Sequence, residues 1–199
     1  MKHLIVAAFT AFLSLFQSHV TTYTKMVDRV SASVVRITVV MDEGQHTCSG
    51  EVIGVNRVLT AGHCFGESIQ ADGIQAKVLK VDKWADLMVL SVLTSKPAIE
   101  FRDSDVVRFE DLTAIGYAFG WSKLSVTQVR AYLLNIDPFD ANNEMAPGLI
   151  VQGTYIGGMS GGPVVDADGR MVGIVQQANQ GIGYGVGTQL MRAFLLGVQ

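Results

Sequence analysis

The sequence has little positive charge, and no segment gathers lysine or arginine into a cluster. Its 199 residues carry 15 lysines and arginines against 18 aspartates and glutamates, which gives a net charge of −3 at pH 7. Proteins that bind nucleic acid broadly present a basic face. The charge pattern therefore excludes nucleic acid as a general partner.

The chain also lacks internal repeats, low-complexity tracts and linkers rich in proline and serine. Only four prolines are present, and charged residues make up 17% of the sequence. A chain of this size with so few charges can bury a substantial core as a single domain. We therefore expect one folded domain over residues 23–199, preceded by an N-terminal segment of different character.

The N-terminal segment is apolar but too short to span a membrane stably. Lys2 and His3 precede an almost unbroken apolar run of 13 residues, Leu4–Phe16, whereas a spanning helix needs about 20. Such a run is typical of a signal peptide, which we predict over residues 1–22, and of an exported protein, periplasmic or secreted. No A-x-A-like triplet follows, so cleavage is expected loosely between Ser18 and Lys25. A short amphipathic or buried helix and an uncleaved anchor are the alternatives.

No histidine follows the serine of the glycine-rich segment Gly158–Pro163 (GMSGGP). A serine hydroxyl is a poor nucleophile unless a base takes its proton. The G-x-S-x-G elbow of the α/β-hydrolases needs that histidine after the serine, so this fold is excluded. All four histidines come earlier, and the segment Thr60–Cys64 (TAGHC) supplies the candidate base, His63. Each segment alone is a weak signal, and the ordered pair points to covalent acyl transfer.

This order, with TAGHC around His63 and GMSGGP around Ser160, resembles that of the trypsin-like serine proteases. The resemblance is closest to their HtrA/Deg-like branch and covers most of the chain, because residues 30–37 resemble its first strand and residues 181–186 its last. It implies a serine endopeptidase that hydrolyses polypeptides through an acyl-enzyme intermediate. A catalytically silent binding module with the same fold and an esterase with the same triad remain open.

The acid of such a triad must lie between the two segments, and Asp86 fits best. It opens the apolar run Leu87–Val92, so its carboxylate can sit at the mouth of a buried strand and face the imidazole. Asp82 is the reserve, because no apolar run follows it. Asp72 ranks third, because the glycine after it makes a common turn pair.

The resemblance implies that Ser160 attacks the peptide carbonyl, that His63 takes the proton and that Asp86 orients the imidazole. The backbone N–H groups of Gly158 and Ser160 would form the oxyanion hole. Met159 stands where digestive enzymes have an aspartate that pairs with a newly cut N-terminus, and no activation sequence of the Ile-Val-Gly-Gly type is present. We expect activity that does not wait for such a cleavage, and the sequence leaves open whether the oxyanion loop is formed at rest.

Cys48 and Cys64 are the only cysteines. By the resemblance, they form the disulfide that links the histidine loop to the neighbouring strand in many trypsin-like enzymes, which needs an oxidising compartment. The alternative is a metal site of His46, Cys48, His63 and Cys64, whose spacing matches no recognised zinc-knuckle pattern. We expect the disulfide, no metal and no other cofactor.

Our predictions about substrate preference and assembly are based on the resemblance alone. No acid falls at the base of the implied primary specificity pocket, so we expect small or medium apolar side chains rather than lysine or arginine. HtrA-like enzymes often carry a PDZ domain and often form trimers. We expect no PDZ domain here, because the chain ends soon after its last expected strand, and an oligomer is an expectation by analogy only. The residues implied for the pocket are Thr154, Gln176, Gln177, Ala178 and Gly185.

The predicted fold class is all-β: two packed six-stranded antiparallel β-barrels of the chymotrypsin type with a short C-terminal helix. We expect a turn at residues 166–169 and a helix over Thr188–Leu196 with Thr188 as its N-cap. His63 and Asp86 would come from the first barrel and Ser160 from the second, with the site in the cleft between them. The expected strands, rich in β-branched residues, are 34–40, 51–55, 57–61, 74–82, 87–92, 112–117, 126–136, 149–153, 163–166 and 171–176. The resemblance adds a last strand over 181–186.

Overall fold

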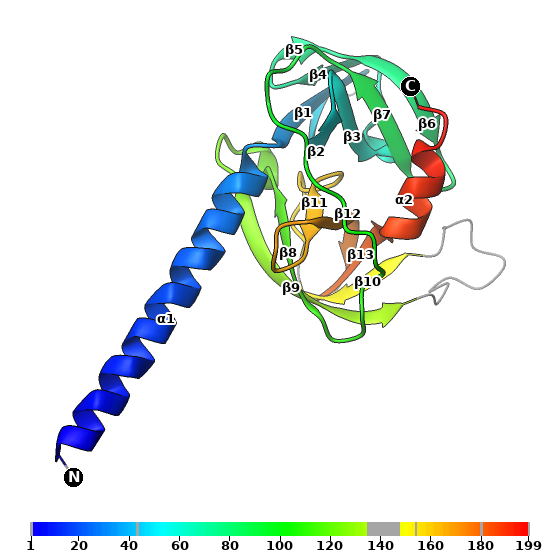
Figure 1. Cartoon of the computed structure of the whole chain (residues 1–199). Helices are drawn as coiled ribbons and strands as arrows, with labels where there is room; N and C mark the ends of the chain where they lie inside the picture. Colours follow the sequence, from blue (N-terminus) through cyan, green and yellow to red (C-terminus); the bar gives the residue numbers. More distant parts are fainter. Residues whose placement is uncertain (1, 43, 135–147, 154, 180, 199) are drawn as a thin grey trace.

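The computed structural model describes residues 2–42, 44–134, 148–153, 155–179 and 181–198. Two antiparallel β-sheets pack together, and a long helix, α1 (Lys2–Ser31), extends away from them (Figure 1). The first sheet contains β1 (Val34–Met41), β2 (Gly44–Gly54), β3 (Arg57–Ala61), β4 (Ser68–Ala71), β5 (Ile74–Gln75), β6 (Lys77–Asp82) and β7 (Leu87–Ser91). The second contains β8 (Asp111–Gly116), β9 (Ser125–Leu134), β10 (Leu149–Gln152), β11 (Pro163–Val165), β12 (Met171–Asn179) and β13 (Ile182–Gly187). Short 3₁₀ turns η1 (Gly62–Cys64) and η2 (Ala118–Gly120) and the helix α2 (Thr188–Leu195) complete the described elements.

The second sheet is a closed six-stranded barrel in the order β10-β13-β12-β11-β8-β9, which confirms the predicted class and strand number for this half. Its interior is filled by small and β-branched side chains, among them Ala114, Val129, Val151, Val164 and Val175. Closure leaves no unpaired strand edge. The barrel is thus a rigid support for the loop between β10 and β11, which carries Ser160.

The first sheet differs from the predicted six strands, because the expected strand over residues 74–82 is broken at Ala76. β5 pairs with β4 at one edge of the sheet, and β6 pairs with β7 at the other edge. The Ala76 N–H donates to the Ile69 carbonyl at 2.9 Å. Residues 74–82 therefore contribute a strand to each edge of the seven-stranded sheet. Because so short a segment reaches both edges, the sheet curls around its own core.

Two strand boundaries in the first sheet were not predicted. β2 begins at Gly44 rather than at residue 51, and its first residues are exposed and polar but pair in register with the end of β1. β4 was not predicted, since four residues ending at a turn carry too little pattern. In the second sheet, residues 135 and 136 of the strand predicted over 126–136 lie outside the described residues.

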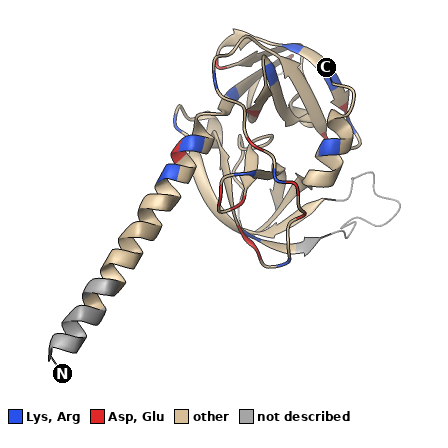
Figure 2. Cartoon of the chain, viewed as in Figure 1, with Lys and Arg blue, Asp and Glu red and all other residues tan. Residues whose placement is uncertain are grey.

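Helix α1 continues well past the apolar run that predicted a signal peptide. The side chains of residues 12–22 are exposed and include no lysine, arginine, aspartate or glutamate (Figure 2). The last turns instead pack on the body through Tyr23, Met26, Val27 and Val30, at the spacing of one helical face. Helix α1 includes residues 30 and 31, which belong to the segment that resembles the family's first strand, and β1 begins at residue 34, where the sequence pattern predicts it. No helix in the described part of the chain has both the length and the apolar character needed to cross a membrane.

The C-terminal helix is confirmed, but its predicted cap is wrong. Gly187 is the N-cap, and Thr188 is the first helical residue. The Thr188 hydroxyl donates to the Val172 carbonyl of β12 at 2.9 Å, so a tertiary contact takes the group that would have capped the helix. Met191 and Phe194 then pack into the same core as the first sheet. Helix α2 in this way ties the second barrel to the first sheet.

Glu51 is a charged residue type buried in β2, and neither of its carboxyl oxygens has a hydrogen-bond partner among the described residues. Burial raises the pKa of this carboxyl well above its ordinary value of 4.5. The folded chain then keeps a proton that the unfolded chain releases. Stability conferred by this group is present below the unfolded pKa and falls as the pH rises toward the folded pKa.

We expect Glu51→Gln, which stays neutral, to lose less stability than the wild type between about pH 5 and about pH 8, because one released proton changes the unfolding free energy by about 1.4 kcal/mol per pH unit. Urea unfolding at both pH values measures this. The exposed Glu100→Gln is the control and should follow the wild type. Equal pH slopes for wild type and Glu51→Gln would contradict the argument.

Candidate active site

His63 and Asp86 lie next to each other at one end of the first sheet. His63 is in η1, directly after β3, and Asp86 directly precedes β7, the strand that pairs with β3. The imidazole Nδ1 lies 2.8 Å from Asp86 Oδ2 and 3.1 Å from Oδ1. The backbone N–H of His63 also donates to Asp86 Oδ1 at 2.6 Å. The carboxylate thus fixes both the ring and the backbone of the histidine.

The two rival acids are engaged elsewhere. Asp82 Oδ1 accepts the backbone N–H groups of Trp84 and Ala85, each at 2.9 Å, and so closes the turn that leads to Asp86. Asp72 accepts the N–H of Arg36 at 2.9 Å and pairs with Lys96 Nζ at 2.9 Å. Of the three predicted acids, only Asp86 is brought to His63.

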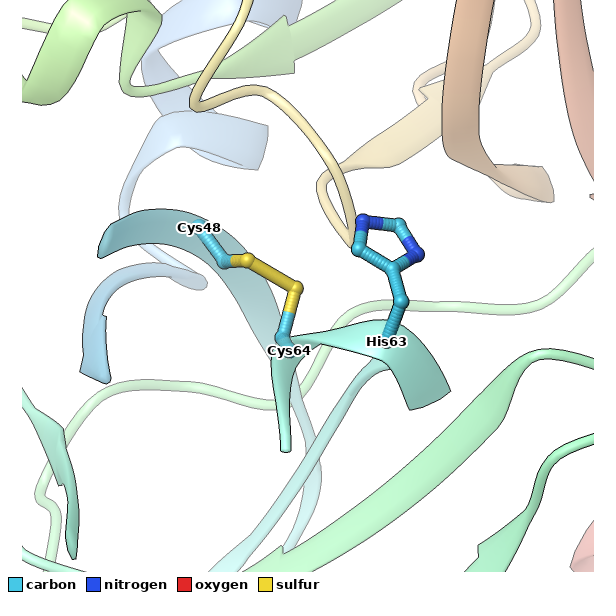
Figure 3. Close-up of side chains that lie close together, drawn as sticks. All are labelled: Cys48, His63 and Cys64. Carbon is cyan, nitrogen blue, oxygen red and sulfur yellow. A yellow bond between two sulfur atoms is a disulfide. The ribbon is translucent and has the colours of Figure 1, made fainter. Parts of the chain in front are cut away.

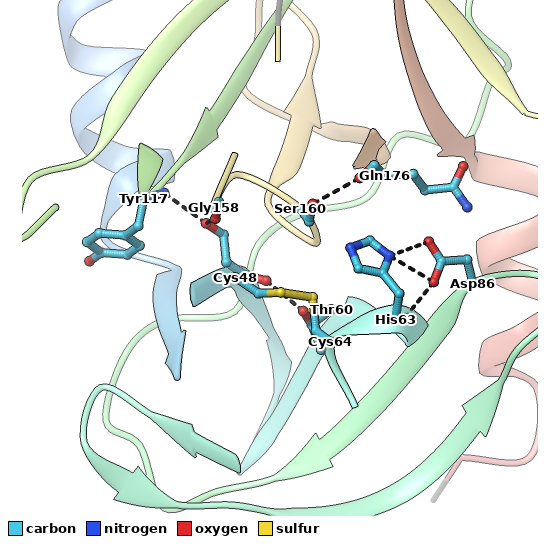
Figure 4. The surroundings of a disulfide bond; sticks show 10 residues. Cys48, Thr60, His63, Cys64, Asp86, Tyr117, Gly158, Ser160 and Gln176 are labelled. Atoms are coloured by element: carbon cyan, nitrogen blue, oxygen red, sulfur yellow. Dashed lines mark hydrogen bonds and ion pairs between the residues drawn. A yellow bond between two sulfur atoms is a disulfide. The ribbon is translucent and has the colours of Figure 1, made fainter. Parts of the chain in front are cut away.

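Ser160 comes from the second barrel, in the loop between β10 and β11. We call residues 157–160 the oxyanion loop. The end of this loop is held from both sheets: the N–H of Gly161, the next residue, donates to the Val175 carbonyl of β12 at 2.7 Å, and the Ser160 backbone carbonyl accepts the N–H of Ser49, in β2, at 2.8 Å. In Figure 4 the His63 ring lies between Asp86 and Ser160, with its second nitrogen on the Ser160 side. The three predicted residues therefore gather where the two sheets meet.

The Ser160 hydroxyl is turned toward β12. Its Oγ donates to the backbone carbonyl of Gln176 at 2.9 Å (Figure 4). Among the described residues, no hydrogen bond joins Ser160 Oγ to His63. A rotation about the Ser160 side-chain bond is needed to bring Oγ to the imidazole, a rearrangement common in sites without substrate.

Among the described residues, the two expected oxyanion donors have no other hydrogen-bond acceptor. In the described part of the chain, no backbone hydrogen bond is donated by the N–H of Gly158 or of Ser160. Gly158 has a φ of +94°, which a residue with a side chain rarely adopts. The carbonyl that precedes it, that of Gly157, accepts the N–H of Phe119 at 2.6 Å, so the Gly158 N–H points the opposite way across the trans peptide.

A cleft of about 520 Å³ opens beside His63 and Ser160. Three of the predicted pocket residues, Gln176, Gln177 and Ala178, line it. Gly185 does not; it is buried in β13, where it pairs with Leu149 of β10 and Val175 of β12. Thr154 lies outside the described residues. The other lining residues are Lys83, Trp84, Asp86, Tyr155, Ile156, Gly157 and Val175.

Tyr155 and Ile156 are two of the lining residues that sequence reasoning missed, and they lie next to the position that it proposed. The resemblance pointed to a residue about six before the nucleophile, and a shift of one position would have found Tyr155. The Tyr155 side chain is buried, and its hydroxyl has no hydrogen-bond partner among the described residues. Burial raises the pKa of this phenol above its ordinary value. It therefore stays neutral and adds no charge to the cleft.

Cys48 and Cys64 form a disulfide, with Cα atoms 6.3 Å apart. It joins β2 to η1, and the His63 imidazole stands beside the sulfur bridge (Figure 3). Cys48, His63 and Cys64 have the ligand types of a metal site within 4.8 Å of one another. Both sulfurs are consumed by the bridge, however, so neither is a thiolate, the form that binds metal.

The disulfide closes a loop across a sequence separation of 16 residues. In the chain-entropy model, such a loop stabilises the fold by about 3 kcal/mol. We therefore expect reductant, or Cys48→Ala with Cys64→Ala, to lower the melting temperature by several degrees. Calorimetry with and without reductant measures this, with the double variant as the control that reductant should not affect. An unchanged wild-type curve under full reduction would contradict it.

Comparison with known proteins matches the sequence of this chain to a protein family. The family model described as a trypsin-like peptidase domain matches residues 48–174, a span that includes His63, Asp86 and Ser160.

The individual relatives share little sequence identity with this chain. Protease Do-like 2 of the Arabidopsis thaliana chloroplast is 26% identical over an alignment 166 residues long that covers 75% of this chain. The chain spans only 27% of that relative's length. The HtrA-type protease AlgW with a tripeptide has 25% identity and a TM-score of 0.77 over 88% of this chain and 63% of its own. The active form of the Rv3671c protease from M. tuberculosis has 22% identity and a TM-score of 0.75, over 86% of this chain and 82% of its own, a likeness of fold alone.

Proposed function

Because the chain belongs to the trypsin-like peptidase domain family, we propose that it is a serine endopeptidase that uses His63, Asp86 and Ser160 as its catalytic triad. The observation that carries the proposal is the position of the His63 ring, with Nδ1 2.8 Å from Asp86 Oδ2 and its other nitrogen facing Ser160. A base oriented by a carboxylate beside a serine hydroxyl is the arrangement that acyl transfer requires.

In the proposed reaction, Ser160 Oγ first leaves the Gln176 carbonyl and turns to His63 Nε2. Oγ then attacks the substrate carbonyl carbon while Nε2 takes the hydroxyl proton. The tetrahedral intermediate collapses, the C–N bond breaks, and the leaving amine receives that proton from His63. Water repeats the sequence on the acyl-enzyme and releases the acid. Throughout, Asp86 keeps the proton on Nδ1 and stabilises the imidazolium.

The N–H groups of Gly158 and Ser160 would donate to the oxyanion formed in each step. Both are free of other hydrogen bonds among the described residues, and they lie on peptide planes fixed by the carbonyl contacts of Gly157 and Met159. Such donors contribute about 3–4 kcal/mol each when they are already oriented. Met159 is fully buried and apolar, so the loop is supported by packing rather than by an ion pair with a new N-terminus.

The proposed substrates are polypeptides with a small or medium apolar side chain at the cleaved position. The only acid that lines the cleft in the described part of the chain is Asp86, which is occupied by His63. A lysine or arginine side chain would find no other countercharge there. The disulfide supports the further proposal that the protein works in an oxidising, exported compartment.

One observation favours a second candidate, a binding module that keeps the fold without turnover. The Ser160 hydroxyl donates to Gln176 rather than to His63. Hydrolysis of unfolded casein and of a simple ester separates the candidates. Cleavage of both supports the endopeptidase, ester hydrolysis alone supports an esterase, and cleavage of neither by well-folded protein supports the binding module.

A further inference from the structure

Ser49 lies in β2 of the first sheet, yet its contacts are with the oxyanion loop of the second barrel. Its side chain is fully buried. The hydroxyl accepts the backbone N–H of Tyr117 at 2.8 Å and donates to the carbonyl of Gly158 at 2.8 Å. Figure 4 shows Tyr117 and Gly158 side by side, on the far side of Ser160 from Gln176. Since the N–H of Tyr117 occupies the acceptor side of the hydroxyl, its proton is directed to Gly158.

The backbone of Ser49 holds the other donor residue. Its N–H donates to the Ser160 carbonyl at 2.8 Å. One residue thus binds the carbonyls of both Gly158 and Ser160, the two residues whose N–H groups form the proposed oxyanion hole. Phe119 and Gly162 bind the carbonyls that precede these N–H groups, those of Gly157 and Met159. The carbonyl of every peptide group that contains or follows the two donors therefore accepts a hydrogen bond, which fixes the orientation of that peptide.

The space around the Ser49 side chain is fitted to a group of this size. A Cβ on Gly116 would come within 2.8 Å of Ser49 Oγ, and one on Gly162 within 3.2 Å of Ser49 Cβ. Glycines at these positions let the loop and the end of β8 close around the hydroxyl. The same close approach leaves little space for a larger side chain at residue 49, and alanine there would leave the Tyr117 N–H and the Gly158 carbonyl without their shared partner.

We propose that Ser49 is a positioning residue, whose hydroxyl holds the Gly158 peptide so that the oxyanion donors are oriented before substrate arrives. The inference rests on the proposed function. A glycine can adopt several backbone conformations at little cost, so Gly158 needs an external contact to stay in one. Electrostatic stabilisation of an oxyanion depends on donors that do not have to reorganise during the reaction. Loss of the hydroxyl should therefore slow the chemical step more than it weakens substrate binding.

The test compares Ser49→Ala with Thr60→Val, a matched control beside it. Thr60 is also fully buried, and its hydroxyl donates to the Ser49 carbonyl at 2.6 Å. Thr60→Val loses one buried hydrogen bond and Ser49→Ala loses two at the same place, but only Ser49→Ala releases Gly158. We expect both variants to lower the melting temperature, Ser49→Ala by more than Thr60→Val. On a fluorogenic peptide taken from a casein cleavage site, Ser49→Ala should lose about 10- to 100-fold in kcat with KM within about threefold of wild type, while Thr60→Val keeps its kcat.

Ser49→Gly is the second variant, and it also serves if Ser49→Ala does not fold. It leaves room for a water molecule to bridge Tyr117 and Gly158, so its kcat should lie between those of the wild type and Ser49→Ala. A purely structural role predicts the reverse order, because glycine is the poorer residue in a strand.

Two results would overturn the inference while the wild type remains active: equal kcat values for the two residue-49 variants and Thr60→Val, or a loss confined to KM. If neither the wild type nor Thr60→Val cleaved the peptide, that result would instead contradict the proposed function itself.

Discussion

Ser160→Ala should lower kcat on casein-derived peptides by about 10⁶-fold, the size found when the nucleophile of a serine triad is removed. The substitution deletes the atom that bonds to the substrate carbonyl, so oriented donors and a base have nothing to activate. Stability should change little. The lost hydrogen bond is a single one to the Gln176 carbonyl at a partly exposed site, and such bonds contribute about 1 kcal/mol.

Peptide cleavage followed by mass spectrometry, with melting temperature measured in parallel, checks this expectation. Ser68→Ala is a suitable control, since Ser68 is outside the cleft and its hydroxyl donates to a neighbouring side chain, Gln75, at 3.2 Å. It should keep the wild-type rate. If Ser160→Ala cleaved the peptides at the wild-type rate, another residue would have to be the nucleophile.

Asp86→Asn should lower kcat at neutral pH by about 10⁴-fold, with a small effect on KM. An amide of the same shape would offer an N–H to Nδ1, so the imidazole would carry its proton on the nitrogen that must act as the base. The backbone bond from His63 N–H to residue 86, 2.6 Å long in the wild type, can still be accepted by the amide oxygen. The histidine loop should therefore stay in place while the tautomer is wrong.

Asp82→Asn is the matched control. Asp82 lies in the same turn and accepts two backbone N–H groups at 2.9 Å, which an amide oxygen can also accept. We expect stopped-flow or steady-state rates close to wild type for this variant. If Asp82→Asn lost activity and Asp86→Asn did not, the acid would be assigned to the wrong residue.

The sequence predicted those features that depend on local pattern or on ordered motifs. Runs rich in β-branched residues gave most of the strands, and the turn at residues 166–169 is present as the link between β11 and β12. The motifs around His63 and Ser160 gave the family. The acid was predicted from one further observation, the apolar run after Asp86, because a strand that enters the core beside β3 brings the residue before it to the histidine.

Features that depend on tertiary contact could not be predicted in this way. The break at Ala76 arises because the two edges of the first sheet meet there. The Thr188 hydroxyl donates a hydrogen bond to the Val172 carbonyl rather than capping helix α2. Gly185 was assigned to the pocket and Tyr155 was not, because alignment through a glycine-rich turn slips easily by a residue. Ser49 carries no motif signal, since its partners are 68 and 109 positions away along the chain.

The central claim is that Ser160 is a nucleophile activated by His63, and labelling of purified protein with a fluorophosphonate probe tests it most directly. Peptide mass spectrometry should find the probe on Ser160 in the wild type and no label there in His63→Ala, whose ring is half exposed and whose loss should not unfold the domain. Absence of label in well-folded wild-type protein, or equal labelling of His63→Ala, would contradict the claim.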